Sequence, residues 1–190
     1  MSYYSGHELS NMGFKYIGNN VKVSTRASIY NYEKIEIHDN SRIDDFCLLS
    51  GKITIGKYVH IAPFCNLAGG EKGIFIEDFV GIAYGNHIFT QTDDYSGEAM
   101  TSPLIPEKFT KVIKRIVLIK IDSIIGTNSI IMPGVTIETG TSVGLKSVVY
   151  GKTKEWSIYS GNPAIKIGDR SRKLLEKVKV FHSENLGPTE

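Results

Sequence analysis

Large aliphatic residues recur every six positions along most of this chain. In the C-terminal half they are Ile119, Ile125, Ile131, Ile137, Val143 and Val149. The N-terminal half keeps the spacing in four sets of three, which are Ile17, Val23 and Ile29; Ile37, Ile43 and Leu49; Ile55, Ile61 and Leu67; and Ile76, Ile82 and Ile88. A period of six fits neither a helix nor the simple alternation of a long strand. Short strands joined by tight corners explain it, so the pattern predicts a β-solenoid in which three sides make one coil and each coil stacks on the next.

The two cysteines hold the same position in successive coils of this frame, because Cys47 and Cys65 are eighteen residues apart. We expect them to stack about 5 Å apart, the spacing of neighbouring strands. Two small core residues are the favoured interpretation. A disulfide, which a reducing compartment disfavours, and metal binding by two thiols are the alternatives.

The six-residue pattern breaks after the segment IFTQTD, which ends at Asp93. The frame predicts an aliphatic residue near position 94, but the repeat resumes only near 116–119. An insertion of this length in a solenoid predicts a protruding loop, at about residues 94–115. Long loops in compact domains are commonly functional, and the mixed aromatic, proline and charged content here favours an ordered loop.

Composition and charge narrow the class of protein. The 190 residues carry a net charge of +2, so nucleic acid is not expected as the main partner. No apolar run approaches the roughly 20 residues of a membrane span. The N-terminal residues lack the basic and apolar regions of a secretory signal. We therefore expect a cytoplasmic protein with a single solenoid domain.

The hexads, the segment PGVTI and the closing segment SGNPAIKI together resemble the hexapeptide-repeat acyltransferases, over about residues 17–167. Sugar O- and N-acetyltransferases are the most similar members. The resemblance implies an all-β, left-handed parallel β-helix in residues 1–167. It also implies a homotrimer, with acetyl-CoA as acyl donor in the groove between neighbouring solenoids and a sugar acceptor under the extended loop. No metal is expected.

The resembled enzymes use a histidine as general base at the last hexad position before the loop, and this chain has Asp93 there. A base works best near the working pH, and the reference pKa is about 3.9 for aspartate and about 6.5 for histidine. A carboxylate suits an amine acceptor, already nucleophilic when neutral, better than it suits a hydroxyl. We take Asp93, its neighbour Asp94, and His87 one hexad earlier as catalytic candidates. The alternatives are a solvated turn and a surface histidine.

Three further residues are candidates for binding the acceptor. The spacing of the coils predicts that His87 stacks on Asn66, giving a polar pair beside the loop. Tyr95 and Ser96 follow the acidic pair and could bind sugar hydroxyls. A turn around Gly97 is the alternative explanation for the last two.

Small residues of the late coils line the coenzyme A groove in the resembled enzymes, where they let the pantetheine approach the backbone. The corresponding candidates are Gly126, Thr127, Gly144 and Leu145, with Lys152 for a phosphate and Gly161, Pro163 and Ala164 near the adenine. The alternative for each glycine is a corner requirement of the repeat.

Residues 168–190 are predicted to form a C-terminal helix and tail. The helix is expected over 169–185, because Leu174, Leu175, Val178 and Phe181 form an apolar stripe. We expect it to pack on a solenoid as a cap or trimer contact.

The sequence thus favours an acetyl-CoA-dependent sugar O- or N-acetyltransferase that works by direct attack of the acceptor. A non-catalytic β-solenoid used for assembly or binding is the alternative. A β-solenoid carbonic anhydrase needs three histidines around zinc. His60 and His87 fall on different sides of the frame with no third histidine beside them, which disfavours that enzyme.

Overall fold

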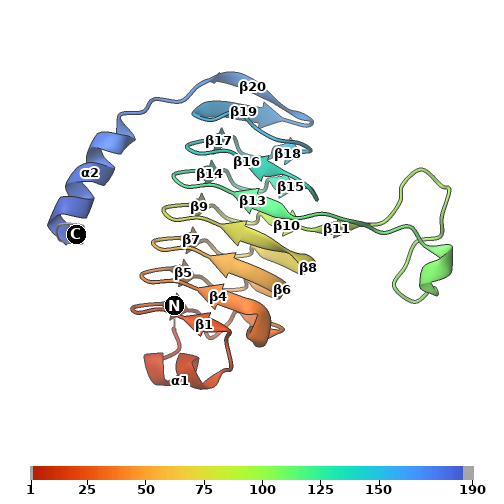
Figure 1. Ribbon diagram of the computed structural model, residues 1–190, viewed down its shortest axis with the longest axis horizontal. Helices are drawn as coiled ribbons and strands as arrows, with labels where there is room; N and C mark the ends of the chain where they lie inside the picture. The colour runs from red at the N-terminus through yellow and green to blue at the C-terminus, as the bar shows by residue number, and fades with distance from the viewer. Residues whose placement is uncertain (1, 186–190) are drawn as a thin grey trace.

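A computed structural model describes residues 2–185 and shows a parallel β-solenoid with three faces per coil (Figure 1). The coils comprise residues 16–29, 35–49, 53–67, 74–89, 117–131 and 136–149, numbered here as coils 1 to 6. The hexad aliphatics point inward as predicted, and Ile43, Leu49 and Ile61 have no exposed surface. Helix α1 (Gly6–Asn11) packs its Leu9 against the core.

The strands of the three faces are short, except where one strand continues around a corner. The first face holds β1 (Tyr16–Ile17), β4 (Ile35–Ile37), the second parts of β6 (Leu48–Ile55) and β8 (Asn66–Ile76), β13 (Val117–Ile119) and β16 (Thr136–Ile137). The second face holds β2 (Lys22–Val23), β5 (Arg42–Ile43), β7 (His60–Ile61), β9 (Gly81–Ile82), β14 (Ile124–Ile125), β17 (Ser142–Val143) and β19 (Ser157–Gly161), which pairs antiparallel with β20 (Ala164–Asp169). The third face holds β3 (Ser28–Ile29), the first parts of β6 and β8, β10 (His87–Phe89), β15 (Ile130–Ile131) and β18 (Val148–Val149), and η1 (Tyr32–Lys34) follows β3.

The register predicted from the hexads is confirmed. His87 pairs with Asn66 across neighbouring coils, and Leu48 pairs with Asn66 from the other side. Cys47 and Cys65 are buried free thiols that donate hydrogen bonds to backbone carbonyl groups. The interpretation as two small core residues is therefore confirmed.

The corner between the first and second faces puts one residue of each coil in the left-handed region. These residues are Asn20, Asn40, Tyr58, Phe79, Asp122 and Gly140, with Trp156 beyond coil 6. Glycine and asparagine adopt this conformation most readily. Tyr58 and Phe79 are less suited to it, and their stacked rings, 5.2 Å apart, stabilise the corner.

Helix α2 (Leu174–Asn185) begins later than the predicted start at residue 169. The prediction was wrong there because residues up to Asp169 pair with β19, and that long-range pairing leaves no local signal. The predicted packing on the solenoid is confirmed by Phe181, whose ring lies 5.1 Å from Tyr58 in an edge-on contact. The division of the chain near residue 168 stays a prediction.

Within residues 2–185, no helix is both long and apolar enough to cross a bilayer.

Candidate active site

The break in the repeat forms an arm that projects from the solenoid after β10 (Figure 1). Its stem is an antiparallel pair of β11 (Gln91–Thr92) and β12 (Ile113–Lys114), and η2 (Glu107–Phe109) lies near its tip. The predicted loop, 94–115, therefore omitted the first strand of the stem. Two residues cannot show a strand pattern by themselves, and pairing across the loop creates this strand.

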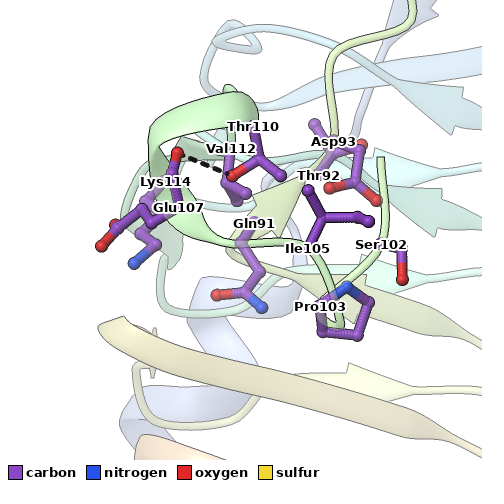
Figure 2. A pocket seen from close by; sticks show the side chains of 10 residues that line it. All are labelled: Gln91, Thr92, Asp93, Ser102, Pro103, Ile105, Glu107, Thr110, Val112 and Lys114. Carbon is purple, nitrogen blue, oxygen red and sulfur yellow. Dashed lines mark hydrogen bonds between the residues drawn. The ribbon is translucent and has the colours of Figure 1, made fainter. Parts of the chain in front are cut away.

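A cavity of about 420 Å³ lies inside the arm, and Asp93 lines it (Figure 2). Thr92, Ser102, Ile105 and Thr110 contribute to the same wall. Among residues 2–185, no hydrogen-bond or ion-pair partner neutralises the Asp93 carboxylate. The cavity thus contains an acid that the fold itself does not use.

Asp94 has a different environment from its neighbour. Its carboxylate accepts hydrogen bonds from the Ser96 hydroxyl at 2.7 Å and from the Ser96 backbone N–H at 3.2 Å. These hydrogen bonds hold the pKa of Asp94 below its ordinary value. Asp94 and Ser96 therefore fix a turn in the arm, whereas Tyr95 between them is 91% exposed.

The predicted pair of Asn66 and His87 stands on the third face, from which the arm departs. The Oδ1 atom of Asn66 is buried and has no hydrogen-bond partner within residues 2–185. His87 is exposed beside it. A buried acceptor without a donor is costly, and water, a ligand or another chain commonly satisfies such an atom.

A row of small outward-facing residues runs along the second face. We call Ala62, Ala83, Gly126, Gly144 and Ser160 the small-residue row. Backbone hydrogen bonds hold it in register, including Ala83 N–H to Ile125 O at 3.0 Å and Gly126 N–H to Val143 O at 2.8 Å. Sequence analysis found the two glycines but missed Ala62 and Ala83. Both hold the same hexad position in earlier coils, which was the available signal.

The two glycines of this row are also required by the stacking of the coils. A Cβ atom on Gly126 would lie 2.6 Å from the Leu145 backbone nitrogen, and one on Gly144 would lie 2.8 Å from the Ser160 hydroxyl. Thr127 is partly buried and Leu145 is exposed beside the row. The close stacking of the coils therefore explains these two glycines, and it is compatible with a second role beside coenzyme A.

The remaining candidates lie near the C-terminal end of the row. Lys152 forms an ion pair with Glu138 at 2.9 Å, and Lys120 pairs with the second oxygen of Glu138 at 2.8 Å. Gly161, which has φ +103°, begins the turn between β19 and β20, and Pro163 and Ala164 complete it. Lys152 is tethered by Glu138, although its side chain remains exposed.

The arm and the small-residue row belong to different faces of the solenoid. In Figure 1, the labels of β5, β7, β9 and β14 on the second face stand on one side of the solenoid, and the arm extends from the other. The arm itself follows β10 of the third face.

Comparison with known proteins decides the family. The scan against family models finds no match. The chain is 38% identical over 190 residues to the dTDP-4-amino-4,6-dideoxy-D-glucose acyltransferase of Escherichia coli, and the match covers 98% of each chain. The chain belongs to the sugar acyltransferases. The predicted family and acyltransferase activity are thereby confirmed.

Solved structures show the same relationship. AntD, an N-acyltransferase from Bacillus cereus in complex with dTDP and coenzyme A, superposes with a TM-score of 0.96 at 44% identity, covering 97% of this chain and 100% of that chain. A hexapeptide-repeat acetyltransferase from Vibrio cholerae shares the fold, with a TM-score of 0.59 at 20% identity over 87% of this chain and 76% of that chain. The fold of this sugar acyltransferase is the predicted left-handed parallel β-helix.

The histidines of the solenoid do not converge. His60 is on β7 of the second face, and His87 is on β10 of the third. Within the part of the chain that the structure describes, no group of three or more His, Cys, Asp or Glu side chains could hold a metal ion.

Proposed function

We propose that this acyltransferase moves an acetyl or other short acyl group from acyl-CoA to the amino group of a nucleotide-linked amino sugar. The unpaired Asp93 carboxylate in the arm cavity carries the proposal. It occupies the position at which the resembled enzymes have a histidine, and a carboxylate suits an amine acceptor better than it suits a hydroxyl. The two relatives named for amino-sugar or N-acyl transfer support it. Transfer to a sugar hydroxyl is the competing reaction.

In this reaction the neutral amine attacks the carbonyl carbon of the thioester. The carbon–nitrogen bond forms, the carbon–sulfur bond breaks, and coenzyme A leaves as a thiolate. The nitrogen loses one proton, which the Asp93 carboxylate accepts and passes on to the thiolate. Asp94 does not share this role in our proposal, because the Ser96 hydrogen bonds favour its ionised form and occupy its oxygens. Tyr95 and Ser96 complete the turn that presents Asp93 to the acceptor.

The acyl donor would lie along the small-residue row. We call the space over the small-residue row the donor trough. Without side chains at Gly126 and Gly144 it would admit a pantetheine chain close to the backbone, with Thr127 and Leu145 along its border. The turn Gly161–Ala164 ends the row and would border the adenine, with Pro163 inside it. Lys152 would contact a phosphate after release from Glu138, which follows β16 of the first face.

The site would be assembled between copies of a homotrimer, with the arm of one protomer over the small-residue row of the next. The placement of the arm and the second face on different sides of the solenoid supports this arrangement. Tyr95 and Leu104 of the arm are 91% and 90% exposed, and large apolar side chains of this kind favour a protein partner. Native mass measurement should give three times the 21.1 kDa chain mass. A monomer at micromolar concentration would contradict the trimer.

The proposed location is the cytoplasm. Two buried cysteines in the reduced form fit a reducing compartment.

Thiol release from acetyl-CoA with dTDP-linked amino sugars and matched neutral sugars tests the reaction. The wild type should acylate the amino sugar. Asp93→Asn should lower kcat by about 10²–10⁴-fold, the usual contribution of a general base. Glu98→Gln is the matched control, because it removes an exposed arm carboxylate that pairs only with Lys111 in the described chain. A wild-type kcat in Asp93→Asn would contradict the role of Asp93. Loss of kcat in His87→Ala alone would identify His87 as the base.

A further inference from the structure

Basic side chains form a column on the second face toward its N-terminal end. Lys22, Arg42 and His60 occupy equivalent outward positions in coils 1, 2 and 3 and stand in parallel register. His60 in turn pairs with Gly81 of coil 4, the coil from which the arm departs. We call Lys22, Arg42 and His60 the basic column.

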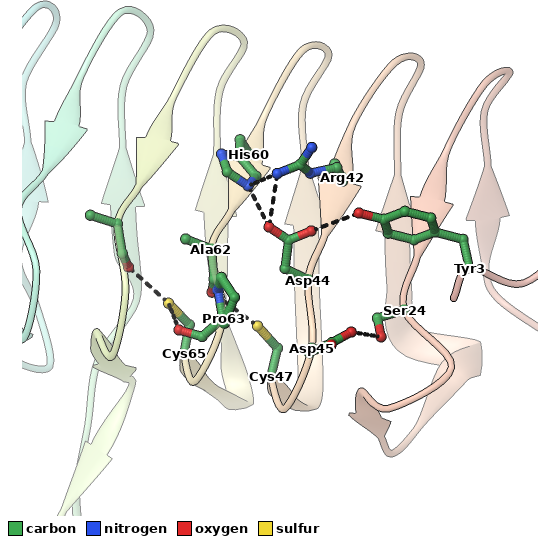
Figure 3. A network of polar contacts seen from close by, with 11 residues as sticks. Tyr3, Ser24, Arg42, Asp44, Asp45, Cys47, His60, Ala62, Pro63 and Cys65 are labelled. Atoms are coloured by element: carbon green, nitrogen blue, oxygen red, sulfur yellow. Dashed lines mark hydrogen bonds and ion pairs between the residues drawn. The ribbon is translucent and has the colours of Figure 1, made fainter. Parts of the chain in front are cut away.

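A buried carboxylate holds two members of this column in place (Figure 3). The side chain of Asp44 is 1% exposed. Its Oδ2 atom accepts a hydrogen bond from Arg42 Nη2 at 2.9 Å and lies 2.7 Å from His60 Nε2, while Oδ1 accepts from the Tyr3 hydroxyl at 3.1 Å. Burial opposes ionisation, but the hydrogen bonds from His60, Arg42 and Tyr3 prevail and lower the pKa of Asp44. The carboxylate therefore remains charged and orients both basic groups.

Arg42 and His60 keep donors that Asp44 does not use. Asp44 is ionised, so the 2.7 Å contact is a hydrogen bond donated by His60 Nε2, and Asp44 does not use the second ring nitrogen, Nδ1. The guanidinium of Arg42 is a planar fork suited to phosphate oxygens. Its Nε atom is buried without a partner within residues 2–185, so a phosphate would be bound through the terminal nitrogens of the fork. The two side chains are 43% and 47% exposed, so their outer edges are accessible.

The two basic groups are also crowded. Arg42 Nη2 lies 2.9 Å from His60 Nε2, and both atoms carry protons when Nε2 donates to Asp44. Two N–H donors therefore face each other beside one buried carboxylate. An anion bound to their outer side would offset the repulsion between these donors.

The distance between the basic column and coil 4, from which the arm departs, matches the length of an acceptor that carries a phosphate group. Neighbouring coils are about 4.8 Å apart, so His60 and Arg42 lie about 5 Å and about 10 Å from the level of Gly81. A sugar whose amine is acylated near coil 4 would extend its anomeric substituent over one to two coils. The N-terminal segment closes the far end, where Tyr3 bridges Ser24.

We propose that Arg42 and His60, oriented by Asp44, bind the diphosphate of the nucleotide-sugar acceptor, and that Lys22 extends this anion site by one coil. The inference rests on the proposed function, because it takes the acceptor to be nucleotide-linked. It assigns the N-terminal half of the second face to the acceptor and the C-terminal half to the acyl donor.

Calorimetric titration with dTDP tests the site, with acetyl-CoA binding measured on the same samples as the check of folding. Arg42→Gln should weaken dTDP binding by about 10- to 100-fold, as expected for lost hydrogen bonds to a charged group. Arg42→Lys should recover part of the affinity, because it restores the charge without the fork. Lys34→Gln is the control, since Lys34 is an exposed cation of η1 outside the second face. It should bind dTDP like the wild type.

Should Arg42→Gln fail to bind acetyl-CoA through misfolding, the milder His60→Gln and Lys22→Gln keep the test decisive. Each should still weaken dTDP binding severalfold. Wild-type affinity for dTDP in all folded variants overturns the anion site but leaves the acyltransferase proposal standing. Wild-type protein that acylates only free amino sugars and does not bind dTDP also overturns the site. Absence of acylation with every amino sugar would instead contradict the proposed reaction itself.

Discussion

At the scale of single residues, the close approach of stacked coils decides which glycines can be replaced. Gly126→Ala would put a methyl group 2.6 Å from the backbone nitrogen of Leu145, where no side chain can yield. We expect a loss of about 1–3 kcal/mol in the free energy of unfolding, and a Tm lower by several degrees. Gly151→Ala is the control, because a Cβ there meets no atom within 4 Å. Equal Tm values for both variants would contradict this account of the small-residue row.

Asp122 gives a pH-dependent prediction at the same scale. It occupies the left-handed corner that Asn20 and Asn40 occupy in coils 1 and 2, and its Oδ1 is buried with no partner among residues 2–185. Burial raises the pKa of Asp122, against the opposing charges of Arg170 and His182. A raised folded-state pKa contributes stability below the unfolded pKa of about 3.9, and that contribution is lost as the pH rises through the folded pKa.

Asp122→Asn should therefore stabilise the protein at pH 7, by about 0.5–2 kcal/mol, because it removes a buried charge and suits the left-handed corner. The gain should be smaller at about pH 4, because lowering the pH toward the raised folded-state pKa of Asp122 protonates more of the wild-type carboxyl. Thermal unfolding at both pH values measures it. Asp39→Asn should show the opposite sign, because the Asn19 backbone N–H and Lys57 lower the pKa of Asp39. A gain in Asp122→Asn that does not depend on pH would contradict the argument.

At the scale of elements, α2 packs on the solenoid through aromatic rings, and Phe181 makes two of these contacts. Phe181 packs edge-on against Tyr58 at 5.1 Å and against Phe79 at 5.9 Å. Phe181→Ala should increase hydrogen exchange of the α2 amides by about 2- to 10-fold, which corresponds to the loss of aromatic contacts. Val180→Ala, at a half-exposed position of the same helix, should leave the exchange unchanged. Similar exchange in both variants would mean that other contacts hold the helix.

The elements also show what the sequence could predict. The hexads predicted the coils and the stack of His87 on Asn66, because every coil repeats the same inward position. The start of α2 and the stem of the arm were missed, because both depend on antiparallel pairing between segments without a repeat. The candidate site residues were proposed from the same frame: Gly126 and Gly144 follow the hexads, Asp93 ends the last regular hexad, and their roles stay predictions.

The Asp44 network was not predictable in this way. Its members come from coils 2 and 3 and from the N-terminal segment, and Tyr3 lies outside the repeat altogether. The sequence offered the basic residues as isolated charges. Their convergence on one buried carboxylate becomes visible only when the coils are stacked.

At the scale of the whole molecule, an active site shared between protomers requires the arm of one copy and the small-residue row of another. The arm carries the base candidate Asp93, and the second face carries the small-residue row, where Ala83 would form part of the floor of the proposed donor trough. Asp93→Asn should abolish the base without disturbing the trough. Ala83→Phe should fill the trough without disturbing the arm. Each variant alone is therefore expected to be nearly inactive.

The most direct measurement is the acyl-transfer rate of mixed oligomers obtained by co-expressing these two variants with different tags. A site shared between copies predicts recovered activity in the mixed species, because some interfaces combine an intact arm with an intact trough. The separately purified variants, mixed without subunit exchange, serve as the baseline. Mixed oligomers no more active than this baseline would contradict the account, because the reaction would then take place within a single protomer.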